Sequence, residues 1–155
     1  MRLLKLFRMV SKGFFMKLGK TEGWYQVIHV EDLTNLIMLA AVRPEARSEV
    51  IIAAGDEPML ISDMVKLIAE KIGRRVRIIQ LPVWPFYVAA DVCCAICRPF
   101  GISPPLYRRR VDFFTKDRRF DISKAKRLLD YQYKYDNERG IEETANWYLN
   151  QKLIS

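Results

Sequence analysis

The side chains with the most direct chemical potential are the single histidine, His29, and three consecutive arginines, Arg108, Arg109 and Arg110. An imidazole exchanges a proton near neutral pH, and planar guanidinium groups bind phosphate oxygens through paired hydrogen bonds. No serine, cysteine or carboxylate stands at a recognisable motif spacing from His29, as a catalytic partner would. We therefore expect His29 to be structural or to line a binding site. The arginine run either clamps a phosphate or forms a solvated helix face.

Three cysteines, Cys93, Cys94 and Cys97, lie in one apolar segment and could join His29 in a zinc site. Adjacent residues on a helix point about 100° apart, however, and a single Cys-x-x-Cys lacks the second pair of ligands. The cysteines also do not follow a strand at an exposed helix start, as redox pairs do. We expect them to pack a buried helix, and we expect no metal site.

Tyr148 and Lys152 have the Tyr-x-x-x-Lys spacing, in which a lysine lowers the pKa of a tyrosine so that the phenol can act as an acid or base. Tyr148 lies in the last expected helix, on the face where Ile141 and Ala145 point to a core. A short motif outside its structural context recurs by chance. We predict that Tyr148 is a core residue and that the chain contains no catalytic residue.

The chain has 155 residues, which suits a single domain, and a formal net charge of +8. Its basic residues gather at 2–20, 108–110 and 116–127. This charge favours an anionic partner, which could be a phosphate-bearing small molecule, nucleic acid or a membrane surface. No recognised nucleic-acid motif is present, so we expect a small molecule and not nucleic acid.

Neither the N-terminus nor the most apolar segment, 81–96, predicts a membrane or secreted protein. Lys5 and Arg8 interrupt any signal-peptide core. The apolar segment contains Pro82 and Asp91 and is shorter than the roughly 18 to 20 apolar residues that span a bilayer. We expect a buried helix there, no membrane partner, and a cytoplasmic protein.

Helices alternate with short strands along the chain, which predicts an α/β fold. The run 49–55 is continuously apolar and ends in glycine, a pattern typical of a strand buried on both faces. Ser123 or Asp121 is expected to cap a short helix that carries Ala125, Leu128 and Leu129. The other expected helices cover about 3–14, 32–42, 62–72, 86–97 and 106–114, with a last helix from about 138. The expected strands cover 24–30, 49–55 and 76–81.

The segment 25–41 organises this pattern, because a short strand runs directly into an amphipathic helix. Leu33, Leu36 and Ile37 begin an apolar face at helical spacing. Asp32 stands at the helix start, where a carboxylate can accept hydrogen bonds from backbone N–H groups that lack helical partners.

A strand ending in His29-Val-x-Asp32 before such a helix resembles the extended short-chain dehydrogenase/reductase family, the NAD-dependent epimerases and dehydratases. The stretch 120–129, with Asp-x-Ser-Lys-Ala, and the stretch 140–148, with a closing Thr and Trp-Tyr, are similar to that family's C-terminal motifs. The run 110–121 looks closer to the hydroxysteroid-dehydrogenase-like and dihydroflavonol-reductase-like branch. The resemblance covers nearly the whole chain, but only the family's C-terminal half.

The resemblance implies that residues 1–155 are one substrate-binding portion of an extended Rossmann-type reductase, without the N-terminal dinucleotide-binding half. The family uses NAD or NADP to take hydride from a carbinol carbon while a tyrosine takes the proton. Its Gly-rich turn is absent, because no three of the seven glycines have the required spacing. We therefore expect this chain to bind no dinucleotide and to be inactive alone. A missing half or a second copy would cover apolar surface left open.

By the same resemblance, the substrate-binding residues are Tyr25, His29 and the run Arg108 to Arg110. Sugar-nucleotide members commonly have an arginine four positions before the histidine, where this chain has Tyr25. The substrate is therefore either a nucleotide-sugar or a sterol-like molecule. Two other functions stay open: a small basic nucleic-acid-binding module, whose binding would fall steeply with salt, and a membrane-surface module.

Overall fold

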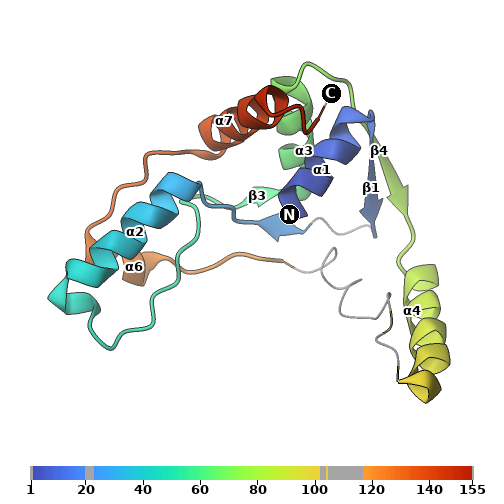
Figure 1. The fold of residues 1–155 in the computed structure, drawn as a ribbon, viewed down its shortest axis with the longest axis horizontal. Coiled ribbons are helices and arrows are strands. Elements are labelled where there is room, and N and C mark those ends of the chain that lie inside the picture. Colours follow the sequence, from blue (N-terminus) through green and yellow to red (C-terminus); the bar gives the residue numbers. More distant parts are fainter. Residues whose placement is uncertain (1, 20–22, 102–103, 105–116, 155) are drawn as a thin grey trace.

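The computed structural model describes residues 2–19, 23–101, 104 and 117–154. Short strands alternate with helices in this part of the chain, as the sequence predicts (Figure 1). In chain order the elements are α1 (Arg2–Ser11), β1 (Phe14–Leu18), β2 (Trp24–Tyr25), α2 (Val30–Val42), η1 (Pro44–Ala46), β3 (Met59–Leu60), α3 (Ile61–Lys71), β4 (Arg77–Leu81), α4 (Trp84–Cys97), η2 (Arg98–Phe100), α6 (Ser123–Leu129) and α7 (Asn137–Asn150).

The described strands form two separate pairs. β1 and β4 are parallel, with Phe14 opposite Arg77 and Leu18 opposite Leu81. β2 and β3 are antiparallel, with Trp24 opposite Leu60. The parallel pair and the alternation of strands with helices confirm the α/β class.

The main core lies between α1, α3 and α7, which pack together at one end of the molecule (Figure 1). Each helix contributes one apolar stripe at helical spacing. Phe7 of α1 meets Tyr148 of α7 edge to face, with ring centroids 5.0 Å apart. The buried residues of this core include Phe7, Val10, Phe15, Met64, Val65, Ile68, Ala69, Ile141, Ala145 and Tyr148. A smaller cluster joins α2, η1 and α6 through Leu36, Ala46 and Leu129.

The strand expected over 49–55 does not form. Val50 is 83% exposed, and no described strand pairs with this segment. The expected strand 24–30 is likewise reduced to Trp24–Tyr25. The two segments still touch, since Gln26 Nε2 donates a 2.6 Å hydrogen bond to the carbonyl of Gly55. An apolar run becomes a buried strand only when a neighbouring strand supplies its hydrogen bonds. The described residues contain no such neighbouring strand beside 49–55.

The N-terminal helix is shorter than expected, because α1 ends at Ser11 and Phe14 begins strand β1. Gly13 turns the chain with a positive φ of 81°. The apolar spacing of this region fits a helix or a strand, and the pairing of β1 with β4 decides between them. Helix α3 ends at Lys71, and Gly73 just beyond it turns the chain with a φ of 66°, as predicted.

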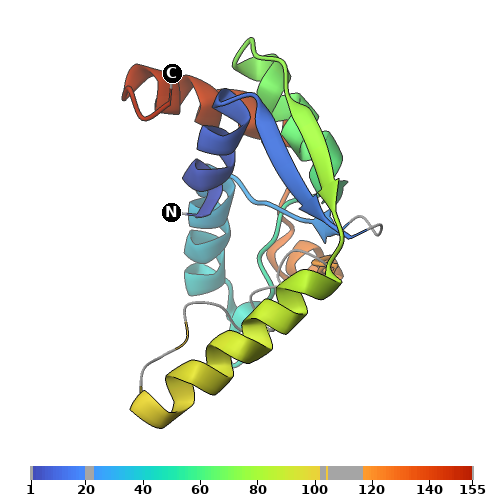
Figure 2. The same ribbon diagram turned by 90° about the vertical axis from the view of Figure 1, so that its right-hand side faces the viewer.

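Helix α4 was expected to be buried, and this prediction was wrong. Ala90 is its only buried residue, and Figure 2 shows the helix extending away from the core. The predicted helix over 106–114 lies outside the described residues. No helix in the described part of the chain is long and apolar enough to cross a membrane.

Each of the two C-terminal helices has a carboxylate near its start, of which only Asp121 was predicted, and the buried faces are largely the predicted ones. Asp121 accepts a 2.9 Å hydrogen bond from the N–H of Ser123 at the start of α6. Asp136 accepts a 2.7 Å hydrogen bond from the N–H of Arg139 at the start of α7. Ile141, Ala145 and Tyr148 of α7 are buried as predicted.

Candidate functional site

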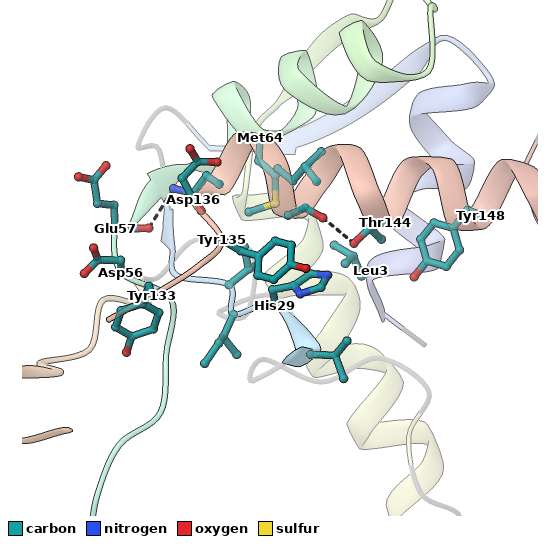
Figure 3. A pocket seen from close by; sticks show the side chains of 16 residues that line it. Leu3, His29, Asp56, Glu57, Met64, Tyr133, Tyr135, Asp136, Thr144 and Tyr148 are labelled. Carbon is teal, nitrogen blue, oxygen red and sulfur yellow. Dashed lines mark hydrogen bonds between the residues drawn. The ribbon is translucent and has the colours of Figure 1, made fainter. Parts of the chain in front are cut away.

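A cavity of about 560 Å³ opens between the segment that leads into α2 and the inner face of α7 (Figure 3). Leu3 of α1 and Met64 of α3 close its apolar side, and acidic residues stand at its other side. It is lined by Leu3, Val27, Ile28, His29, Val30, Asp56, Glu57, Met64, Tyr133, Tyr135, Asp136, Asn137, Gly140, Ile141, Thr144 and Tyr148.

His29 stands at the centre of this cavity and is held on three sides. It is the N-cap of α2, where its Nδ1 accepts a 3.4 Å hydrogen bond from the N–H of Glu31. Its ring stacks on Tyr135, with centroids 3.8 Å apart. Nε2 lies 3.7 Å from Oε2 of Glu143. Because Nδ1 is the acceptor at the helix cap, a neutral His29 carries its proton on Nε2.

Tyr135, the stacking partner, is a neutral phenol at physiological pH. Its OH donates a 3.0 Å hydrogen bond to Glu31, and the guanidinium of Arg139 lies 4.8 Å from its ring centroid. The hydrogen bond to Glu31 is the main cause that raises the pKa of Tyr135 to about 12, and burial adds to it. The phenol therefore contributes a flat apolar face and not a base.

Asp32 holds the Tyr131–Tyr135 segment against the start of α2. Its side chain is buried and accepts hydrogen bonds from the Tyr131 OH at 2.5 Å, the Lys134 N–H at 3.1 Å and the Tyr135 N–H at 3.2 Å. We predicted that Asp32 caps its own helix. That role belongs to His29, because the donors of the returning segment occupy both Asp32 oxygens.

Helix α7 supplies the opposite wall of the cavity. A Cβ at Gly140 would lie 3.9 Å from the His29 side chain, so the missing side chain leaves room beside the imidazole. Thr144 Oγ1 donates a 2.7 Å hydrogen bond to the carbonyl of Gly140, and its lone pairs are left to accept from a ligand. At the rim, Asp56 forms an ion pair with Lys126.

The structure brings one of the predicted site residues into this cavity. Tyr25 lies outside it, where the guanidinium of Arg118 is 5.6 Å from its ring centroid. Burial raises the pKa of Tyr25, and the charge of Arg118 partly offsets this. The run Arg108 to Arg110 lies outside the described residues.

Sequence reasoning missed Tyr133 and Tyr135, the two tyrosines of the cavity wall. They alternate with polar residues, and this period of two is the signal that could have found them, because alternate side chains of an extended segment point to one side.

The Tyr148 and Lys152 pair does not form a catalytic unit. Tyr148 is 5% exposed, and burial raises the pKa of its phenol, whereas a catalytic lysine would lower it. Lys152 follows the end of α7 with a positive φ of 52°.

The cysteines of α4 are a separate case. Burial is the main cause that raises the pKa of the Cys97 thiol, and the neighbouring Cys93 adds to it. No group of three or more potential metal ligands occurs among the described residues.

The junction between β4 and α4 does not have the form of a pyrophosphate cradle. A pyrophosphate cradle needs small residues where a parallel strand enters a helix. The described junction of this kind, between β4 and α4, has Pro82 and Val83 instead. A methyl group of Val83 fills the space beside Gly19, 2.8 Å from where a Cβ on Gly19 would stand.

Comparison with known proteins identifies relatives of this chain. No family model matches the chain. An uncharacterized protein, y4nG, of Sinorhizobium fredii is 28% identical over 144 residues, which are 92% of this chain and 35% of that protein. A UDP-glucose 4-epimerase of Vibrio cholerae is 23% identical over 145 residues, which are 93% of this chain and 40% of the epimerase. The chain thus spans less than half the length of these relatives.

Solved structures match the fold over nearly the whole chain. The protein gox2253 superposes with a TM-score of 0.76 at 19% identity, covering 100% of this chain and 46% of its own. An epimerase of Methanothermobacter thermautotrophicus gives a TM-score of 0.69 at 21% identity, and the match covers 96% of this chain and 37% of the epimerase. A UDP-glucuronic acid 4-epimerase of Bacillus cereus in complex with NAD superposes with a TM-score of 0.59 at 17% identity. This match covers 92% of the present chain and 35% of the epimerase. The chain has the fold of part of these epimerases.

Proposed function

We propose that this chain is the substrate-binding portion of an NAD(P)-dependent epimerase, dehydratase or dehydrogenase that acts on a carbinol carbon of a nucleotide-sugar or sterol-like substrate. Residues 1–155 form one unit in this proposal. In this proposal NAD or NADP binds to a dinucleotide-binding half that lies outside residues 1–155, so these residues by themselves bind substrate without turning it over.

One observation carries the proposal: two motifs far apart in the sequence line one cavity. His29 comes from the His-Val-x-Asp unit, and Gly140 and Thr144 come from the closing motif. Gly140 leaves room directly beside the His29 ring. The resemblance to the extended reductases thus concerns residues that meet in space, and the fold similarity to epimerases supports the same assignment.

The chemistry of the cavity suits a ring that carries hydroxyl groups. His29 Nε2–H can donate, whereas Thr144 and Asp136 can accept. The faces of Tyr133 and Tyr135 offer apolar contact of the kind that ligand pockets combine with a few polar groups. Arg108 to Arg110 then bind the phosphate of a nucleotide-sugar, and Tyr25 borders that part of the ligand.

Helix α2 offers a surface for the dinucleotide-binding half. Ile37, Met38 and Val42 are exposed on it, and Val50 lies exposed in the segment that follows. Exposed apolar side chains gathered on one helix are a surface that other protein usually covers. The relatives are more than twice as long as this chain, so their additional length is the occupant we propose. A second copy of the chain is the alternative occupant.

The test is a titration of the isotope-labelled chain, followed by NMR, with UDP-glucose and separately with a hydroxysteroid. We expect the amide signals of His29, Gly140 and Thr144 to shift with one of the two. Gly140→Leu fills the cavity and should abolish the shifts. Asn146→Leu, a substitution on the exposed side of the same helix, is the matched control and should preserve them. Shifts confined to other residues, or none with either ligand, contradict the proposal.

A basic nucleic-acid-binding module remains the second candidate. The guanidinium of Arg119 lies 5.3 Å from the ring centroid of Trp24, next to the similar pair of Arg118 and Tyr25. Alternating aromatic and cationic groups suit single-stranded nucleic acid. Binding of an oligonucleotide that falls steeply with salt and is lost in Trp24→Ala would favour this candidate.

A further inference from the structure

The segment 48–57, which we call the strap, runs along one side of the cavity without forming a helix or a strand. Its last residues, Asp56 and Glu57, line the cavity. Figure 3 shows them beside Tyr133, on the side opposite Tyr148. The backbone of an extended segment is normally held by a neighbouring strand, and no described strand pairs with this one. Other contacts must therefore hold the strap in place.

Ion pairs tie the strap to helix α6 near both of its ends. Glu49 lies 2.6 Å from the ammonium of Lys124, and Asp56 forms an ion pair with Lys126. All four charged side chains are partly exposed, and an exposed ion pair stabilises a structure only weakly. Two side-chain amides donate further hydrogen bonds to strap carbonyls: Gln26 to Gly55 at 2.6 Å and Asn137 to Glu57 at 3.0 Å.

The strap buries little apolar surface. Val50 is 83% exposed and Ile52 is 46% exposed. Ile51 is half-buried against the smaller cluster of α2, η1 and α6, and Ala54 is 3% exposed. Segments with few buried apolar contacts open at a lower free energy than the core does. The strap therefore belongs to the part of the structure that opens most easily.

Tyr133 lies beneath the strap. Its ring packs against the same small cluster as Ile51, and the ammonium of Lys126 is 5.8 Å from its centroid. Its hydroxyl is buried and has no hydrogen-bond partner among the described residues. Burial is the main cause that raises the pKa of Tyr133, and the charges of Asp56 and Asp32 add to it. The phenol is thus protonated and lacks an acceptor.

Two features disfavour the closed position of the strap. A buried hydroxyl without a partner has lost its hydrogen bonds to water, so it destabilises the state that buries it. Ser48, at the start of the strap, has a φ of 60°, which a residue with a side chain seldom adopts. Opening the strap would hydrate the Tyr133 hydroxyl and let Ser48 return to an ordinary backbone conformation.

We propose that the strap opens and closes one wall of the cavity, and that the buried hydroxyl of Tyr133 keeps the closed position only slightly favoured. The ion pairs to α6 hold the closed position. Neutralising Lys124 and Lys126 therefore favours the open position, whereas removing the hydroxyl favours the closed one. This gate controls access to the cavity whichever ligand occupies it, so it does not depend on the proposed function.

A thiol at position 54 reports opening, because this position is buried when the strap is closed. In a chain with Cys93→Ala, Cys94→Ala and Cys97→Ala, Ala54→Cys introduces the sole thiol. Its rate of reaction with a water-soluble disulfide reagent measures the open population. Ala69→Cys, at a buried position of α3, is the matched control for opening of the main core. We expect Ala54→Cys to react at least about tenfold faster than Ala69→Cys.

Two further changes should shift this rate in opposite directions. Lys124→Gln with Lys126→Gln should speed the reaction at position 54 by about threefold or more, and salt should speed it only while these lysines are present. Tyr133→Phe should slow the reaction by about fivefold or more. Lys66→Gln breaks a comparable exposed ion pair within α3 and should leave the rate unchanged.

NMR relaxation dispersion of the unaltered chain guards against misfolding of the cysteine variants. Exchange on the microsecond-to-millisecond timescale should appear in the strap and not in α3. Equal reaction of the two thiols, a strap without exchange, or a rate that Tyr133→Phe does not lower overturns the proposal. The last result would mean that water already satisfies the hydroxyl of Tyr133 when the strap is closed.

Discussion

The phenol of Tyr131 donates a 2.5 Å hydrogen bond to Oδ1 of Asp32, whose side chain is 1% exposed. This bond and two backbone N–H groups of the same returning segment saturate a carboxylate that would otherwise be buried without partners. A buried carboxylate is tolerated only when it is hydrogen-bonded in this way. Asp32 thereby fixes Tyr133 and Tyr135 at the cavity, and the acidic residue of the first motif acts as a positioning residue.

We predict that Asp32→Asn lowers the free energy of unfolding by about 2 to 3 kcal/mol, because an amide NH₂ cannot accept from the donors that face it. Urea denaturation measures this change. Tyr131→Phe removes one bond and should cost less. Asp63→Asn, at an exposed carboxylate of α3, should change stability by less than about 0.5 kcal/mol. A loss in Asp32→Asn no larger than in Asp63→Asn would contradict this role.

Two glycines should respond in opposite directions to alanine. A Cβ at Gly55 would lie 1.8 Å from the carbonyl oxygen of Val27, so Gly55→Ala forces two backbone segments apart and should cost about 3 kcal/mol. Gly140 sits in α7 with its nearest contacts at 3.9 Å, so Gly140→Ala should stabilise the chain by about 0.5 to 1 kcal/mol through helix propensity. Thermal unfolding of both variants tests the pair. Equal effects would show that the close approach at Gly55 is not rigid.

Stability should fall as the solution becomes alkaline. Burial and the hydrogen bond to Asp32 raise the pKa of Tyr131 to about 12, and the hydrogen bond to Glu31 is the main cause of a similar rise at Tyr135. In the unfolded chain both phenols ionise near 10. Between these values the folded state holds more protons, so the free energy of unfolding decreases with rising pH. The contribution is complete below about pH 10.

Urea denaturation at several pH values between about 9 and 12 measures this dependence. The double variant Tyr131→Phe with Tyr135→Phe lacks both phenols and should show a shallower decrease. Absorbance at alkaline pH gives an independent readout, since two tyrosines should ionise later than unperturbed ones. Identical pH profiles for the two chains would contradict the assignment.

Tyr148 should behave as a core residue. Tyr148→Ala removes the edge-to-face contact with Phe7 and should cost about 3 to 5 kcal/mol, whereas Tyr148→Phe keeps the ring and should cost less than about 1 kcal/mol. Lys152→Ala should leave the alkaline titration of the tyrosines unchanged, because the raised pKa of Tyr148 comes from burial. A rise in that pKa on removing Lys152 would restore the Tyr-x-x-x-Lys interpretation.

The sequence by itself determined the class of fold and the ends of several helices. Amphipathic spacing located α2, α3 and α7, because local periodicity indicates a helix with one apolar face. It was wrong about Ile37, which is exposed on α2. Gly73 turns the chain after α3, and Asp121 accepts a hydrogen bond at the start of α6, as the sequence predicts, because turns and caps are local interactions. The sequence also supplied His29 as a candidate site residue.

Only the tertiary structure decided how distant segments meet. In the folded chain, hydrogen-bond donors of the segment 131–135 bond to Asp32, and Gly140 lies beside His29. The apolar run that contains Val50 has no partner strand among the described residues. The tertiary structure also left α4 exposed, although its composition predicts burial. The physical reason is the same in each case. A hydrophobic side chain favours burial and a polar group needs a hydrogen-bond partner, but neither property determines which distant residue will be the neighbour.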